Sequence, residues 1–380
     1  MSEYQYYEFQ AFDRTLSDAD IKALRALSSR ARIGATSFTN SYDWGDFRGD
    51  PVELMRRWFD LHLCFSHFGA HRLMIKLPKR LVDRHRLDGF LRKDGCATLR
   101  AAGENLILDI MGEELYPSEE DDGSGWLAAL APLRADVLGG DLRLFYLLWL
   151  TEVEAGAADP GELEPMPGIG PLTGPLQAFA ELFQLDGDLV EAAAENVTGK
   201  EVAQQPSSEA IRQVVSALPE REKVELLARL AEGEPHVASE LRALVRRRLA
   251  SSAEATGALR TVGDLRARAR AIREAREQAE VREREADRKR EIAVQARVRR
   301  KRLDEIVRKG DAVWREVETE IERRNPSGYR LATELLLDLK LIADESDAIA
   351  DFDRRLAAIR ERHARKGQFI LKLAEAMREK

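Results

Sequence analysis

The spacing of apolar residues in the first hundred positions alternates between strand-like and helix-like segments. Aromatic or apolar runs with the composition of β-strands lie at 4–12, 33–42, 72–77, 96–100 and 105–110. The last two runs flank the sequence AAGEN, whose glycine suits the turn of a hairpin. Helical segments separate the other runs, so the predicted order is βαβαβαββ. This order predicts an α+β domain over residues 1–155, with a small mixed sheet and helices.

Two signals mark where helices begin in this domain. Ser17-x-x-Asp20 has the spacing of a capping box. Asp50 followed by Pro51 places an N-cap before a residue favoured in the first helical turn. Apolar residues then recur every three or four positions, so the pattern predicts a helix from Pro51 to about Phe68.

After this domain the pattern indicates helices only. Residues 156–174 contain four prolines and five glycines, which predicts a Pro/Gly-rich linker or a wrapping loop. A helical domain is predicted at 175–255 and a long charged helix at 256–324. From 259 to 324 there is no proline and there are two glycines, so one helix here extends roughly 100 Å. A helical hairpin is predicted at 325–380.

The long helix has the apolar spacing of a coiled coil only in part. Larger apolar residues recur every three or four positions near both of its ends, whereas the centre has Ala279, Ala286 and Ala293 seven residues apart. A strong coiled coil needs larger apolar residues at both core positions throughout. We therefore expect the ends to pack within the chain, and the centre to stand free or to meet a partner.

Charge is distributed unevenly along the chain. The net charge is -7, but residues 260–309 hold 18 Lys/Arg and 10 Asp/Glu, which is +8 and leaves -15 for the remainder. A chain that is acidic in its globular part and basic in its long helix could associate head to tail with a second copy.

The most basic stretch lies in the long helix. Its cations are Arg288, Lys289, Arg290, Arg297, Arg299, Arg300, Lys301 and Arg302. One interpretation is sequence-independent contact with nucleic-acid phosphates. The other is a solvated helix, because nearby carboxylates such as Asp287 and Glu291 allow many i,i+4 ion pairs. No aromatic residue is interleaved, so base stacking is not expected.

A short loop between a predicted strand and a predicted helix has the residue types of a recognition site. The sequence YDWGDFRGDP places Trp44, Asp46, Phe47 and Arg48 within five positions. Aromatic residues in loops often take part in binding. The alternative is that these aromatics fold back and cover the core.

The chain has six histidines and two cysteines, and three histidines and one cysteine lie between residues 59 and 71. On the predicted helix, Cys64, His67 and His71 would share one side. One straight helix cannot surround a metal, and Phe68 lies where a zinc-protease helix needs glutamate. The polar face of an amphipathic helix is the competing interpretation, and a metal site is the less favoured one.

The sequence has no other signature of catalytic chemistry. There is no GxxxxGK[ST], no GxGxxG and no nucleophile elbow, so we predict no catalytic residue and no cofactor. The acidic run 119–122 lacks EF-hand spacing and predicts a solvated loop. The two cysteines and the absence of a secretory signal pattern favour the cytoplasm. The most apolar run, 144–150, is too short for a bilayer and predicts a buried helix, so no membrane association is expected.

Four segments carry a resemblance to known sequences. They are LPEREKVELLARLAEGEPHVASELRALVRRR (218–248), AAIRERHARKGQFILKLAEA (357–376), GIGPLTGPLQAFAELFQLDGDLVEAAAE (168–195) and GWLAALAPLRADVLGGDLRLFYLLWL (125–150). They resemble a group of uncharacterised bacterial proteins in general character. The resemblance implies a bacterial cytoplasmic origin, and it transfers no activity and no functional residue.

These observations favour a non-enzymatic interaction or scaffold protein. It would act through the α+β domain and the long helix, and its partner would be another protein or a second copy. The first alternative is a nucleic-acid-associated protein that uses the basic stretch. The second is a metal-dependent enzyme.

Overall fold

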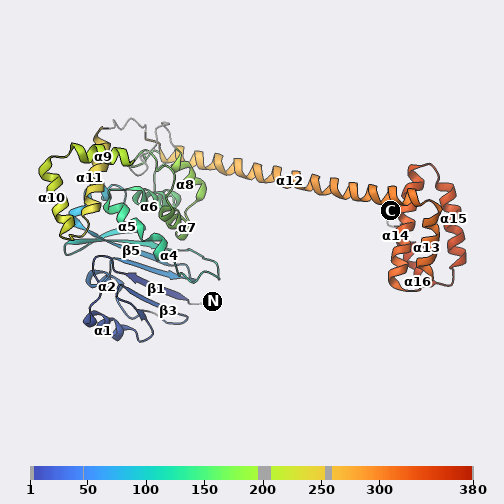
Figure 1. Cartoon of the computed structure of the whole chain (residues 1–380), viewed down its shortest axis with the longest axis horizontal. Helices are drawn as coiled ribbons and strands as arrows, with labels where there is room; N and C mark the ends of the chain where they lie inside the picture. Colours follow the sequence, from blue (N-terminus) through green and yellow to red (C-terminus); the bar gives the residue numbers. More distant parts are fainter. Residues whose placement is uncertain (1–3, 46, 196–206, 253–258, 379–380) are drawn as a thin grey trace. The chain divides into compact units, whose positions relative to one another are not determined.

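The computed structural model describes residues 4–45, 47–195, 207–252 and 259–378 (Figure 1). The chain divides into two compact units, Met1–Ala275 (unit 1) and Arg276–Lys380 (unit 2). Helix α12 (Val262–Lys309) is continuous across the boundary between them. The α+β class of the N-terminal part and the helical character of the C-terminal half, including a long helix, are confirmed.

Unit 1 is built on a seven-stranded sheet in the order β2-β3-β1-β4-β5-β7-β6. The strands are β1 (Gln5–Gln10), β2 (Arg32–Ile33), β3 (Ser37–Tyr42), β4 (Leu61–Ser66), β5 (His71–Pro78), β6 (Ala97–Ala102) and β7 (Asn105–Gly112). Every described pairing is antiparallel, whereas a mixed sheet was expected. Short turns join β4 to β5 and β6 to β7, and such turns reverse the chain, because parallel pairing needs a long crossover.

The prediction of a helix from Pro51 to about Phe68 is correct for the first two turns and wrong for the residues after them. Helix α2 (Pro51–Arg57) ends early, and the following residues form β4. Strand β4 lies inside the sheet and both of its faces are covered, so its apolar residues form a nearly continuous run. Such a run lacks the simple alternation of a half-exposed strand, and this explains the error.

The local signals in the first hundred residues are confirmed. Ser17 caps α1 (Asp18–Leu27) through a capping box with Asp20, and the Asp50 side chain accepts a hydrogen bond from the Val52 amide. Gly103, at φ +61°, forms the turn between β6 and β7. Between β5 and β6 the helical structure is short and consists of the 3₁₀ turn η1 (Lys79–Leu81) and α3 (Arg84–Asp88).

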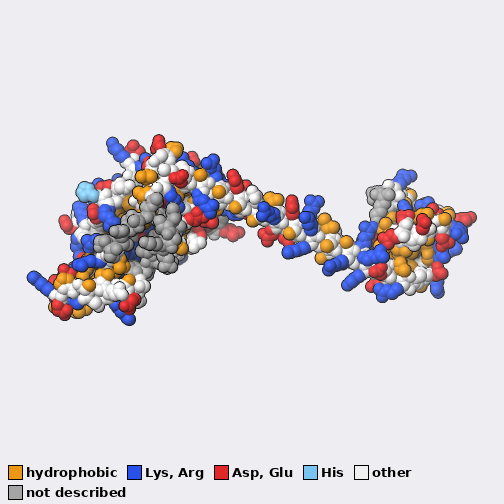
Figure 2. Space-filling view, turned by 90° about the horizontal axis from the view of Figure 1, so that it is seen from above, with side chains coloured by type: hydrophobic (Ala, Val, Ile, Leu, Met, Phe, Trp, Pro, Cys, Tyr) orange, Lys and Arg blue, Asp and Glu red, His pale blue; other side chains and the backbone are white. Residues whose placement is uncertain are grey.

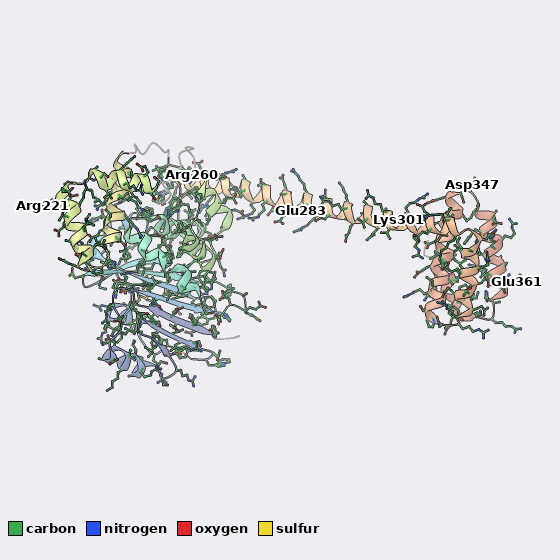
Figure 3. The ribbon with its side chains drawn as sticks, in the orientation of Figure 1. Arg221, Arg260, Glu283, Lys301, Asp347 and Glu361 are labelled. Atoms are coloured by element: carbon green, nitrogen blue, oxygen red, sulfur yellow. The ribbon has the colours of Figure 1, made fainter. Side chains whose placement is uncertain are left out.

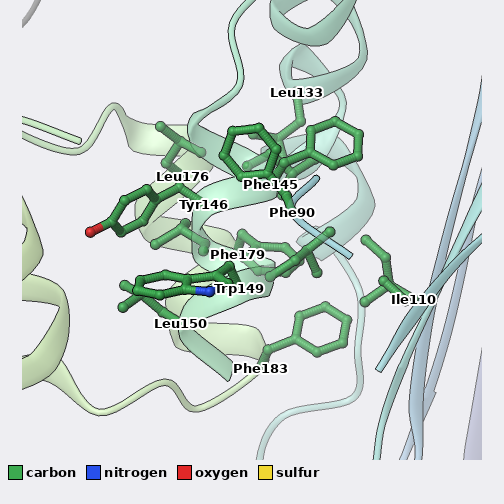
Figure 4. Packing of buried hydrophobic residues seen from close by; sticks show 14 of the residues in the cluster. Phe90, Ile110, Leu133, Phe145, Tyr146, Trp149, Leu150, Leu176, Phe179 and Phe183 are labelled. Atoms are coloured by element: carbon green, nitrogen blue, oxygen red, sulfur yellow. The ribbon is translucent and has the colours of Figure 1, made fainter. Parts of the chain in front are cut away.

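Helices cover both faces of the sheet. Helices α1 and α2 pack on one face over β1 and β3, around Phe9, Phe38 and Phe59. On the other face lie α4 (Trp126–Leu130), α5 (Pro132–Leu138), α6 (Arg143–Glu154), α7 (Gly174–Leu182) and α8 (Gly187–Ala194). Figure 4 shows Phe145 and Trp149 of α6 packed among these helices, which confirms the predicted buried helix.

The Pro/Gly-rich segment 156–173, which we call the wrapping segment, packs against other parts of unit 1. Its contact with the rest of the chain includes a bridge between Leu163 and Thr261. Ala158 and Ile169 are buried in the core. The segment therefore packs within unit 1 and does not separate two units.

The remaining helices of unit 1 are α9 (Ser208–Ala217), α10 (Glu220–Ala231) and α11 (Val237–Ser252). Unit 2 contains most of α12, then α13 (Asp311–Glu322), α14 (Pro326–Glu345), α15 (Ile349–Arg362) and α16 (Gly367–Arg378). The long helix ends at Lys309 and does not reach Arg324 as predicted, because Gly310 has φ +53° and ψ -131°. Unit 2 has its own core, which includes Leu336 and Phe369.

Candidate protein-interaction site

The antiparallel register brings four separate segments to one end of the sheet. Gln5 pairs with Tyr42 and with Ser66, and His71 pairs with Gly112. The residues just beyond these positions therefore lie at the same end. They are the start of β1 and the described residues of three loops, which are 43–45 with 47–50, 67–70 and 113–125.

Specific contacts hold these segments together. The Tyr4 hydroxyl donates to the Asp122 carbonyl at 2.9 Å, and the Tyr4 ring lies 5.1 Å from the His67 ring. His67 Nε2 is 2.7 Å from the Asp121 carbonyl oxygen. Burial, together with Asp122 and Asp43, raises the pKa of Tyr4, so its hydroxyl stays protonated and remains a donor. The start of β1 and the two loops thus form one continuous surface.

The loop 113–125 gives this surface its charge. It holds six Asp/Glu and no Lys or Arg. The Asp121 carboxylate is fixed by the Trp126 indole at 2.8 Å and by the Gly123 amide at 2.9 Å. A hydrogen bond from Ser124 lowers the pKa of Asp122 and keeps it ionised.

The other acids of this surface face solvent. Glu113, Glu114, Glu119, Glu120 and Asp43 are exposed. Within the described residues none of these five carboxylates forms an ion pair. Their negative charge is therefore available to a partner.

Three large apolar side chains project from the same loops. Trp44 is 73% exposed, Tyr116 is 69% exposed and Phe68 is 51% exposed. The neighbouring Leu115 is buried, and its amide donates to the Gly69 carbonyl at 3.0 Å, which anchors the loop that carries Tyr116. We call this surface the acidic edge; its residues are Asp43, Trp44, Phe68, Glu113, Glu114, Tyr116, Glu119, Glu120 and Asp122.

The predicted recognition loop divides into two parts. Trp44 points to solvent, whereas Phe47 is half-buried and its ring lies 5.0 Å from that of Tyr7 and 5.8 Å from that of Phe38. Arg48 is exposed. Asp46 lies outside the described residues. The sequence identified Trp44 but not Tyr116 or Phe68. For Tyr116 the available signal was an aromatic residue within an acidic, proline-containing loop, whereas Phe68 was assigned to the helix predicted from Pro51.

The structure separates the predicted metal ligands. Cys64 lies on β4 opposite Tyr7 and Arg72, on the face away from α4–α6, and burial raises the pKa of its thiol to about 11. His71 lies on the other face, with its ring stacked 4.6 Å from that of Phe65. The His67 ring lies 5.8 Å from the Phe65 ring, measured between centroids, in an edge-to-face arrangement. No group of three or more potential metal ligands occurs in the part of the chain that the structure describes.

The basic stretch is exposed on α12. Every residue from 273 to 302 is exposed, and Lys and Arg side chains line both visible margins of this part of the helix (Figure 2). Figure 3 shows Glu283 and its neighbours projecting into solvent. The cations of residues 288–302 therefore surround the helix and do not form one face.

Three of these cations are held by carboxylates and five are not. Arg290 pairs with Asp287 at 3.1 Å. Arg300 and Arg302 reach α14, where they pair with Glu345 and Asp338. Among the residues described, no ion pair is formed by Arg288, Lys289, Arg297, Arg299 or Lys301.

Comparison of the chain with family models, with characterised proteins and with solved structures gives no match. The resemblance to bacterial proteins therefore stays a prediction. No helix within the described ranges combines the length and the apolar character needed to cross a bilayer.

Proposed function

We propose that the chain is a non-enzymatic interaction protein whose acidic edge binds an arginine-rich segment of a partner. The observation that carries the proposal is the exposure of Trp44, Tyr116 and Phe68 among carboxylates. Exposed aromatic residues are typical anchors of protein interfaces. Arginine suits this surface best, because its guanidinium pairs with carboxylates and also stacks on aromatic rings.

The loops of the acidic edge are suited to binding because they are already ordered. The fixed Asp121 carboxylate and the buried Leu115 hold the loop 113–125 in place. Binding to an ordered loop costs less conformational entropy than binding to a loop that must fold first. The unpaired carboxylates add long-range attraction for a basic partner.

The first test is binding of a fluorescein-labelled arginine-rich peptide, measured by anisotropy at low and moderate salt. We expect the double substitution Trp44→Ala, Tyr116→Ala to weaken binding at least about tenfold, since tenfold corresponds to about 1.4 kcal/mol and the loss of a single interface anchor costs about 2 kcal/mol or more. The matched control is Phe12→Ala, because Phe12 is 49% exposed and follows the opposite end of β1. Equal weakening by the control, or no binding by the unsubstituted chain, would contradict the proposal.

A second copy is one partner that carries an arginine-rich segment, at residues 288–302. Sedimentation velocity distinguishes this case from binding to another protein. If a second copy is the partner, the mean mass rises with protein concentration and falls as salt is added. A mass that stays monomeric at all concentrations leaves a different protein as the partner.

The second candidate function is nucleic-acid binding through α12. It is favoured by the five cations of the basic stretch that form no ion pair within the described residues. A protein that neutralises phosphates binds less tightly as salt increases, and each phosphate contact adds to that dependence. The helix has no aromatic residue for stacking in this stretch, so any such binding would not depend on base sequence.

The test of this second candidate substitutes only cations that have no structural partner. Arg297→Glu with Arg299→Glu should lower affinity for a DNA duplex and reduce the slope of log affinity against log salt by about two. Arg300 and Arg302 are left unchanged, because they hold α14. The matched control is Arg360→Glu with Lys372→Glu, two exposed cations on α15 and α16. The same slope in both double variants would exclude a specific role for this part of α12.

A further inference from the structure

Unit 1 also contains a cleft whose lining residues do not include any residue of the acidic edge. It has a volume of about 860 Å³ and is lined by η1, α3, the turn before α6, α10 and α11. This volume lies within the roughly 300–1,000 Å³ of small-molecule sites. The cleft and the acidic edge lie at opposite ends of β5. The segment after Pro78, the last residue of β5, forms one wall of the cleft, whereas His71, the first residue of β5, lies beside the acidic edge.

The walls of the cleft are apolar and only partly covered by the rest of the chain. Leu81, Val82, Leu142, Leu226 and Leu244 line it from four different segments, and each is half-buried. Covering such side chains with another apolar group is favourable by about 25 cal/mol per Å². The walls therefore suit a ligand with an apolar body.

The shape of the cleft follows from a close approach of α11 to the turn before α6. Gly140 has φ +82°, and a Cβ atom there would lie 3.6 Å from Cα of Ala243. The two segments are thus in contact on one side. Leu142, which follows this turn, and Leu244 on α11 line the cleft next to this contact.

Some of the charged residues of the cleft neutralise one another. Arg80 pairs with Glu240, and Arg229 binds the same carboxylate at 2.7 Å. Arg246 lies 3.0 Å from Asp141. These ion pairs fix the walls and leave little charge for a ligand.

Two arginines of the cleft differ from the others. Arg86 on α3 and Arg247 on α11 are exposed and line the cleft from different helices. Neither guanidinium has an ion pair or a side-chain hydrogen bond to any residue that the structure describes. The carboxylate of Asp83 also lines the cleft, but it caps α3 by accepting from the His85 amide at 3.1 Å.

From these features we infer that the cleft binds an amphiphilic anion, an alkyl chain that carries one carboxylate or one phosphate. The chain lies against the leucines, and the anionic group lies between Arg86 and Arg247. A guanidinium recognises either anion through paired N–H donors. This inference does not depend on the function proposed for the acidic edge.

The test is calorimetric titration of the full chain with monomeric dodecanoate, dodecyl phosphate and dodecanol. The result expected is saturable binding of at least one of the two anions, about tenfold tighter than binding of dodecanol, as one charge-assisted hydrogen bond would give. Comparison of the two anions then identifies the head group. Absence of saturable binding for both anions, or equal affinity for dodecanol, would overturn the inference.

Matched variants locate the binding. Arg86→Glu with Arg247→Glu should weaken anion binding at least about tenfold and leave dodecanol unchanged. Leu226→Asn should weaken all three ligands, since it alters the wall that contacts the chain. The control is Arg221→Glu with Arg242→Glu, exposed residues of α10 and α11 outside the cleft (Figure 3 labels Arg221). Equal loss in the control would show a general charge effect and would contradict the proposed site.

Discussion

His62 is an ionisable side chain placed where its charge is not tolerated. It is fully buried on β4, its ring stacks 3.9 Å from that of Phe9, and its Nδ1 lies 2.9 Å from the Glu8 carbonyl oxygen. Its Nε2 has no hydrogen-bond partner among the described residues. Burial lowers the pKa of His62 to about 3, although the contact with the Glu8 carbonyl opposes the shift.

The pH dependence of stability follows from this shift. The unfolded chain takes up a proton at His62 near pH 6.5, whereas the folded chain does so only near pH 3. The contribution of neutral His62 to the free energy of unfolding is therefore complete above about pH 6.5. Below that pH the free energy of unfolding falls by about 1.4 kcal/mol per pH unit. We expect the free energy of unfolding in urea to decrease by about 2 kcal/mol between pH 6.5 and pH 5 from this residue alone.

Two variants separate this effect from other titrations. His62→Phe keeps an aromatic ring beside Phe9 and should remove most of this slope, although it costs stability at pH 7. His85→Gln, on the exposed side of α3, should keep the slope of the unsubstituted chain. If the slope survives in His62→Phe, other groups cause the acid sensitivity.

One buried carboxylate, that of Glu164, connects the wrapping segment to two other elements of unit 1. Glu164 is 1% exposed and accepts hydrogen bonds from the Tyr146 hydroxyl at 2.6 Å and from the Arg260 guanidinium at 2.9 Å. Burial would raise the pKa of Glu164, but these hydrogen bonds outweigh it and lower the pKa. Glu164 thereby joins the wrapping segment to α6 and to the residues before α12.

Removing this carboxylate should destabilise unit 1 strongly. Glu164→Ala leaves the largely buried Arg260 guanidinium without its counter-ion, and breaking a buried pair costs about 3–5 kcal/mol. Because the pKa of Glu164 is lowered on folding, its contribution is present above its unfolded pKa and is lost as pH falls. Chemical unfolding at pH 7 measures the cost. The control is Glu162→Ala, because Glu162 lies in the same segment and its carboxylate is more exposed; an equal cost would contradict this role.

Elements with a local chemical signal could be predicted from the sequence, and those defined by tertiary context could not. The capping box at Ser17, the N-cap at Asp50 and the turn at Gly103 depend on neighbouring residues, and all are present. Strand β4 was missed because burial of both faces removes its alternation. The end of α12 at Gly310 was also missed, although the glycine itself is visible in the sequence.

The candidate site shows the same limit. Trp44 was identified because it is an aromatic residue in a short loop. Its association with Tyr116 and Phe68 depends on the register of β1, β3, β4, β5 and β7, and register is a long-range property. The helical spacing that linked Cys64 to His71 has no meaning on strands, where neighbouring residues point to opposite faces.

At the scale of the whole molecule, each unit has a separate hydrophobic core. Leu147 is fully buried in unit 1 and Leu336 is fully buried in unit 2. The residues of α12 from 273 to 302 add no buried side chain to either core. Stability should therefore be divided between two cooperative transitions.

This division can be measured by thermal unfolding of single-site variants. Leu147→Ala should lower the midpoint temperature of one transition, and Leu336→Ala that of the other. The reason is that each substitution removes about 2–5 kcal/mol from the free energy of unfolding of its own unit. Leu371→Ala is the control, because Leu371 is 64% exposed. A single transition that both core variants shift together would mean that the two units unfold as one.

Binding of a basic segment to the acidic edge can be measured by hydrogen–deuterium exchange of the full chain with and without an arginine-rich peptide. We expect slower exchange of backbone amides in 67–70 and 113–122, with no change at the opposite end of the sheet. Protection confined to other parts of the chain, or no protection at a saturating peptide concentration, would contradict this expectation.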